Sequence, residues 1–98
     1  MKFFDRDGKP ITRDEWGKLC GDDDYRRVAI VDLGERLIST VWLGIDHNFG
    51  KGKPIIFETM VFGDAFVADD YCERYSTLEE AEAGHARIVS RVRSDLNG

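Results

Sequence analysis

The sequence predicts an α+β fold: a four-stranded antiparallel meander sheet, a short N-terminal helix, and a long C-terminal amphipathic helix packed on one face. Four segments between residues 25 and 75 have strand-like apolar patterns and short connections, and consecutive strands of this kind usually pair with one another. Residues 78–96 carry apolar side chains at helical spacing, which gives that helix one face to bury. Residues 13–20 form a shorter helical pattern ahead of the strands. We therefore expect a two-layer domain.

The composition predicts a single domain that spans residues 1–98. The chain has 42% hydrophobic residues and only 2 prolines, which suits one modest core and argues against disorder. Its net charge of −5 argues against direct nucleic-acid binding, which normally needs a basic face. Cys20 and Cys72 are far apart, without the spacing of a zinc site or a disulfide framework. No apolar run reaches membrane-spanning length, so we expect a cytoplasmic protein with reduced cysteines.

The N-terminal third is expected to contain a short strand or arm and one helix. Residues 2–11 include a turn at residues 7–8, Asp-Gly, where glycine supplies a positive φ. A capping box, Thr-x-x-Glu, at residues 12–15 predicts a helix over residues 13–20 that ends at the following glycine. The three aspartates at residues 22–24 are expected to form a solvated loop.

The four strands are predicted over residues 25–32, 37–45, 55–62 and 66–75, with a hairpin turn at residues 33–36. The second and third of them are apolar on both faces, which is more than a one-sided sheet needs. Two interpretations stay open: both faces are covered, or one face is kept for a partner. The two faces of the second strand carry Ile38, Thr40 and Trp42 on one side and Leu37, Val41, Leu43 and Ile45 on the other.

The C-terminal helix has the clearest pattern in the chain. Ser76 or Thr77 is expected to cap it, paired with a glutamate three residues later. Glutamates in its first turns and arginines in its last complement the helix dipole. We interpret His85 as a core or boundary histidine whose ring is hydrogen-bonded. The apolar stripe consists of Leu78, Ala81, His85, Ile88, Val92 and Leu96.

The loop between the second and third strands concentrates polar chemistry. A carboxylate beside an imidazole, as in Asp46-His47, can fix the histidine tautomer and raise its basicity, but turn-forming residues on both sides of a histidine explain the pattern without catalysis. The run Gly-Lys-Gly-Lys at residues 50–53 lacks the helix that follows a P-loop, so a flexible loop is the better interpretation. The candidate binding residues here are Asp46, His47, Asn48, Phe49, Lys51 and Lys53.

Glu58 and an acidic segment complete the set of candidate residues. Glu58 shares a strand face with Ile56, Met60 and Phe62. If it is buried it needs a partner, and if it is exposed its apolar neighbours form a binding surface; a general acid or base is a third possibility. The partners considered for it are Arg26, Arg27, Arg36 and His47. Residues 64–82 hold seven acidic residues against one arginine, and their candidate binding residues are Asp64, Asp69, Asp70 and Glu73.

Three motifs resemble a family of small proteins encoded by bacteriophages and prophages. They are STVWLGIDHNFG, IFETMVFG and ERYSTLEEAEAGHARIV, within residues 39–89, together with the opening DRDGKPITRDEW. The resemblance implies genomic company and transfers no functional residue. Small acidic phage-encoded domains often act by binding a host protein, including as inhibitors of CRISPR and other immunity systems.

The sequence contains no complete catalytic, metal or nucleotide motif. We therefore expect a non-enzymatic protein that needs no cofactor or metal and acts in the host cytoplasm. Its partner would be a host protein or a ribonucleoprotein complex, and a homodimer is possible. Two alternatives stay open: a small enzyme or ligand-binding protein that uses Asp46, His47 and Glu58, and a structural phage accessory protein.

Overall fold

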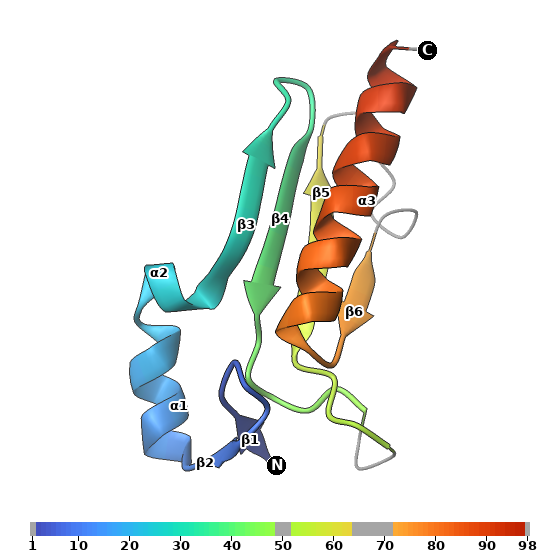
Figure 1. The fold of residues 1–98 in the computed structure, drawn as a ribbon. Coiled ribbons are helices and arrows are strands. Elements are labelled where there is room, and N and C mark those ends of the chain that lie inside the picture. The colour runs from blue at the N-terminus through green and yellow to red at the C-terminus, as the bar shows by residue number, and fades with distance from the viewer. Residues whose placement is uncertain (1, 49–51, 64–71, 98) are drawn as a thin grey trace.

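The computed structural model describes residues 2–48, 52–63 and 72–97. Strands β3 to β6 form an antiparallel sheet in chain order, and β1 pairs with β2 in a separate small hairpin. Helix α3 runs along one face of the sheet, whereas α1 and α2 lie beside the starting end of β3 (Figure 1). The predicted α+β class, the meander and the packed terminal helix are confirmed. The elements are β1 (Phe3–Phe4), β2 (Pro10–Ile11), α1 (Arg13–Cys20), α2 (Asp23–Arg26), β3 (Arg27–Asp32), β4 (Leu37–Trp42), β5 (Phe57–Phe62), β6 (Glu73–Tyr75) and α3 (Leu78–Asn97).

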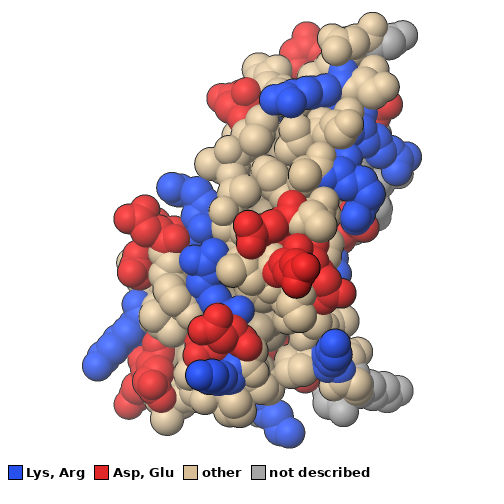
Figure 2. All heavy atoms as spheres, viewed as in Figure 1, with Lys and Arg blue, Asp and Glu red and all other residues tan. Residues whose placement is uncertain are grey.

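The core lies between α3 and the sheet face that it covers. Along β4, Ile38, Thr40 and Trp42 are buried while their neighbours are only half-buried, which is the period-2 pattern of a strand with one covered face. The predicted stripe of α3 meets this face, and Val89 and Gly84 are buried with it. The arginines of α3 stop before its last turn, which has no basic residue. Figure 2 shows acidic side chains over the beginning of α3 and basic ones farther along it.

Local hydrogen bonds explain the N-terminal elements. One carboxylate oxygen of Asp5 accepts the N–H groups of Asp7 and Lys9, and Gly8 takes a positive φ of 81° in that turn. The predicted capping box of α1 is present, with Thr12 and Glu15 bonded reciprocally.

The prediction of a solvated loop over the three aspartates at residues 22–24 is wrong. Asp22 accepts the N–H groups of Asp24 and Tyr25 and so caps the short helix α2, because a side-chain oxygen there satisfies the first N–H groups of a helix. The helix presents the Tyr25 ring edge-on to Trp42, with ring centroids 5.0 Å apart.

The central strands are shorter than predicted. β4 ends at Trp42, and Gly44 follows with a φ of 74°. A Cβ on Gly44 would collide with the rings of Trp16 and Trp42, so the chain leaves the strand where only glycine fits between two tryptophans. The third strand starts at Phe57 and not at residue 55. Of the predicted fourth strand, residues 66–71 lie outside the described residues, and β6 covers its end.

We predict that any side chain at Gly84 destabilises the fold, although glycine inside a helix is usually less favourable than alanine. Alanine there would normally stabilise the helix, but its methyl group would overlap the ring of Tyr75, which is buried and bonded to Thr59. We expect Gly84→Ala to lower the free energy of unfolding by about 1–3 kcal/mol. The matched control is Gly17→Ala on the exposed side of α1, which meets open space and should raise that free energy by about 0.5–1 kcal/mol. Urea denaturation followed by circular dichroism measures both, and a stabilising Gly84→Ala would contradict the packing.

Candidate functional site

The sheet face opposite α3, which we call the open face, is a candidate binding surface. The register places Ile30 opposite Ser39, Ser39 opposite Met60, and Leu37 opposite Phe62. Ile30 and Phe62 are the exposed large hydrophobic residues of the described chain, at 48% and 49%. The described helices therefore leave part of an apolar sheet face in contact with solvent. The open face consists of Arg27, Ile30, Asp32, Leu37, Ser39, Val41, Glu58, Met60, Phe62 and Arg74.

Glu58 forms an ion pair on this face, as one sequence interpretation expected, but its partner was wrongly predicted. Its Oε2 accepts a hydrogen bond from Nε of Arg74 at 2.9 Å, and the side chain of Glu58 is only 14% exposed. The hydrogen bond to Glu58 raises the pKa of Arg74. Arg74 lies directly across from Glu58 on β6, a relation that depends on strand register. The sequence placed Ile56 on the same strand face as Glu58. Ile56 lies before the first residue of β5, so the alternation of that strand does not apply to it, and it is fully buried.

The loop after β4 is held closed by the polar residues that the sequence singled out. Asp46 Oδ1 accepts the N–H groups of Asn48 at 2.7 Å and Ile55 at 3.1 Å. The side-chain amide of Asn48 donates to the carbonyl of Lys53 at 3.0 Å, and the backbone N–H of His47 donates to Ile55 at 2.9 Å. These bonds tie the two arms of the loop together, which favours the turn interpretation. Phe49 and Lys51 lie outside the described residues.

The three residues considered for an enzymatic site, Asp46, His47 and Glu58, lie on different elements. Asp46 and His47 belong to the loop, whereas Glu58 is bonded to Arg74 on the sheet. Within residues 2–48, 52–63 and 72–97, no three histidine, cysteine, aspartate or glutamate side chains are arranged to hold a metal ion.

Of the candidate residues in the acidic segment 64–82, the structure describes Glu73, and this residue forms an ion pair with Arg87. Both of its carboxylate oxygens accept from Nη2 of Arg87, at 2.7 and 2.8 Å. The ion pair joins β6 to α3, and it raises the pKa of Arg87. Asp64, Asp69 and Asp70 lie outside the described residues.

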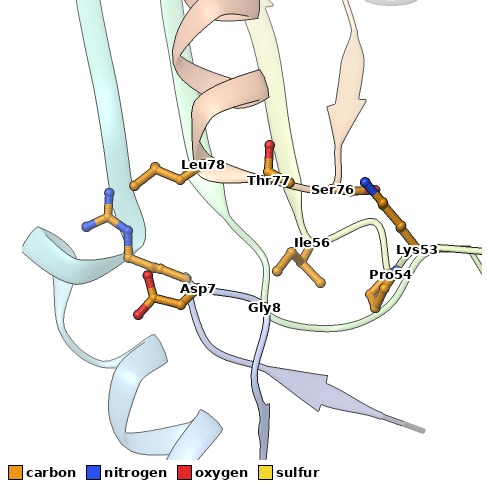
Figure 3. A pocket seen from close by; sticks show the side chains of 9 residues that line it. Asp7, Gly8, Lys53, Pro54, Ile56, Ser76, Thr77 and Leu78 are labelled. Carbon is orange, nitrogen blue, oxygen red and sulfur yellow. The ribbon is translucent and has the colours of Figure 1, made fainter.

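A shallow pocket of about 370 Å³ lies where three distant segments meet. Figure 3 shows Ile56 and Pro54 at its floor, with Lys53 to one side and Thr77 and Leu78 above. Thr77 is bonded reciprocally to Glu80, so one N–H group in the first turn of α3 already has a partner there. Lys53 is the one predicted candidate that lines it, and no local sequence pattern could have found a pocket shared by such separate segments. Its lining is Arg6, Asp7, Gly8, Lys53, Pro54, Ile56, Ser76, Thr77 and Leu78.

His85 belongs to a buried network of polar side chains under α3. Its Nδ1 lies 2.7 Å from the hydroxyl of Thr40, which lies 2.5 Å from the hydroxyl of Thr59. Tyr75 donates its hydroxyl to Thr59 at 3.1 Å. The expected core histidine with a hydrogen-bonded ring is therefore confirmed. Its Nε2 is buried and has no hydrogen-bond partner among the described residues, and burial lowers the pKa of His85.

Comparison of the chain with protein-family models, curated proteins and solved structures finds no match. The resemblance to phage proteins therefore stays a prediction. Of the helices in the described ranges, none combines the length and apolarity that crossing a bilayer requires.

The buried histidine predicts how stability depends on pH. The folded-state pKa of His85 lies below its ordinary value of 6.5, so the unfolded chain binds a proton before the folded protein does. The free energy of unfolding should be highest above pH 6.5 and should fall as the pH drops from there toward the lower folded-state pKa. Urea denaturation at pH values between about 7.5 and about 5, above the range in which most carboxylates titrate, measures this dependence.

Two variants test whether His85 causes this pH dependence of the free energy of unfolding. His85→Gln removes the titrating group and should flatten the dependence in that range, whereas His47→Gln leaves His85 in place and should retain it. An unchanged slope in His85→Gln would show that another group is responsible.

Proposed function

We propose that this protein is a non-enzymatic binding protein that docks on a host protein through its open face, and that it acts as a phage-encoded counter-defence inhibitor of the anti-CRISPR kind. The observation that carries the proposal is the half-exposed pair Ile30 and Phe62 on a sheet face that the described helices leave uncovered. The half-buried Leu37 and Met60 share the face with them, and an exposed apolar surface on a small protein commonly marks an interaction site. The phage origin rests on the sequence resemblance.

The rim of the open face suits recognition of a protein. Glu58 and Arg74 form an ion pair beside the apolar centre. A protein partner that covers both side chains would therefore not bury an unpaired charge. Arg27 and Asp32 are exposed at the edge. Apolar anchors surrounded by polar groups are the usual anatomy of a protein interface. The chain's net charge of −5 favours a basic partner surface.

An enzymatic or small-ligand function draws less support from the geometry. Asp46 uses one carboxylate oxygen to hold the loop closed, and Glu58 is bonded to Arg74. A general base would need a carboxylate or imidazole within reach of a substrate proton, and these two carboxylates already serve the architecture.

Phe62 is predicted to anchor the host partner. Its replacement by serine should cost little stability because the side chain is 49% exposed, but it should raise the dissociation constant at least about tenfold, as expected for an aromatic anchor. The measurement is affinity capture from lysate of the host bacterium, followed by titration of the recovered partner. Phe62→Tyr should keep most of the affinity, and Glu82→Ser on the exposed side of α3 is the control. Recovery of no dominant partner at any salt concentration would contradict the function.

The acidic segment predicts a second, electrostatic contribution. Reversing the charges of Asp69 and Asp70 should weaken the same complex, and the loss should shrink as salt is added because salt screens attraction between charges across an interface. Titration of the purified partner at about 50 mM and about 300 mM salt measures this. Equal affinity of the variant and the wild type at low salt would exclude the segment from the interface.

A further inference from the structure

The outer edge of β3 is unpaired in the described part of the chain. β3 is the first strand of the sheet order, and β4 is its one partner among the described strands. The N–H of Leu33 donates to the carbonyl of Arg36 at 2.8 Å, and hydrogen-bonded pairs alternate with non-bonded pairs along an antiparallel ladder. The peptide groups of Ile30 and Asp32 therefore point outward, away from β4. Such an edge is a template for another strand.

A β-bulge sets which side chains border this edge on the open face. Arg27 lies opposite Val41 and Ala29 lies opposite Thr40, so Val28 is the extra residue. Arg27 and Asp32 would face opposite sides of an unbroken strand, because they are five positions apart. The bulge shifts the alternation by one residue. Arg27, Ile30 and Asp32 therefore share the open face, opposite Val41, Ser39 and Leu37.

This spacing is complementary to itself. If a second β3 lies antiparallel to the first with a two-fold axis at Ile30, the outward peptide groups of the two Ile30 residues bond to each other. Because the bulge adds one residue, Arg27 and Asp32 each lie two register positions from Ile30, opposite Val41 and Leu37 of β4. In that register Arg27 therefore lies opposite Asp32 of the second copy, and Asp32 lies opposite Arg27 of the second copy. Directly opposite side chains of opposite charge stabilise a strand pair, and the two-fold axis provides this contact at both ends.

We propose that a second copy of this chain docks along β3 in this register and joins the two four-stranded sheets into one. Bulges and charges also serve to keep edge strands apart, but a protective edge carries charge in its middle or like charges along it. Here the middle, Ala29-Ile30-Val31, is apolar, and the two ends have opposite signs. The inference does not rest on the proposed function, since it is argued from the backbone edge of β3, although Arg27, Ile30 and Asp32 also belong to the open face. The pairing is short, so the dimer belongs to the weaker class of interfaces.

Sedimentation velocity of the purified protein, from about 5 to about 500 µM, tests the proposal. The wild type should shift from 11.2 kDa toward twice that mass as concentration rises. Arg27→Glu or Asp32→Arg alone should weaken association at least about tenfold, because both contacts become repulsive. The double variant, and an equimolar mixture of the two single variants, should associate again, because each restores opposite charges at both contacts. Arg13→Glu on the exposed surface of α1 is the control and should behave as the wild type does.

A backbone variant tests the same edge without charge. Ile30→Pro removes an N–H that points outward and leaves the bonds to β4 intact, so the monomer should fold, as circular dichroism would show, and should not dimerise. A single species of 11.2 kDa at every concentration would overturn the proposal. So would a dimer that survives Ile30→Pro or either single charge reversal, since it would then form through another surface. Failure of the mixed single variants to associate would also overturn it.

Discussion

α3 packs on the sheet through a stripe that combines aliphatic side chains with one hydrogen-bonded histidine, and the other features of the molecule depend on this contact. His85 reaches Thr40, which lies beside Thr59, and Tyr75 closes the chain of hydroxyl groups from β6. A buried polar group is costly unless it is bonded, so the network fixes the position of α3 along the strands more sharply than apolar contact alone. Gly84 lets the ring of Tyr75 approach the helix.

One helix cannot cover a sheet of this size on both sides, and the consequence is an asymmetric molecule. The face under α3 holds the core, whereas Ile30 and Phe62 on the other face remain half-exposed. The same asymmetry exposes the outer edge of β3, because α1 and α2 lie only at its starting end (Figure 1). The open face and the β3 edge are therefore two adjoining surfaces available for association, which share Arg27, Ile30 and Asp32.

Polar residues that looked chemical in the sequence turned out to hold the architecture together. Asp46 and Asn48 close a loop, Glu58 binds Arg74 across two strands, and Glu73 joins β6 to α3. Short polar side chains next to turns bond readily to nearby backbone groups, which explains why a cluster such as Asp-His-Asn is a weak sign of catalysis. The proposed function accordingly rests on surfaces and not on a reactive group.

The sequence by itself determined the elements whose signals are local. The capping boxes at Thr12 and Thr77, the turn at Gly8 and the stripe of α3 each follow from residues within a few positions of one another. Tertiary structure alone decided the partner of Glu58, the early end of β4 and the burial of Ile56, because these depend on register and on the two tryptophan rings around Gly44. It also decided that Arg27 and Asp32 share a face, since one extra residue in a strand inverts the alternation that a sequence pattern assumes.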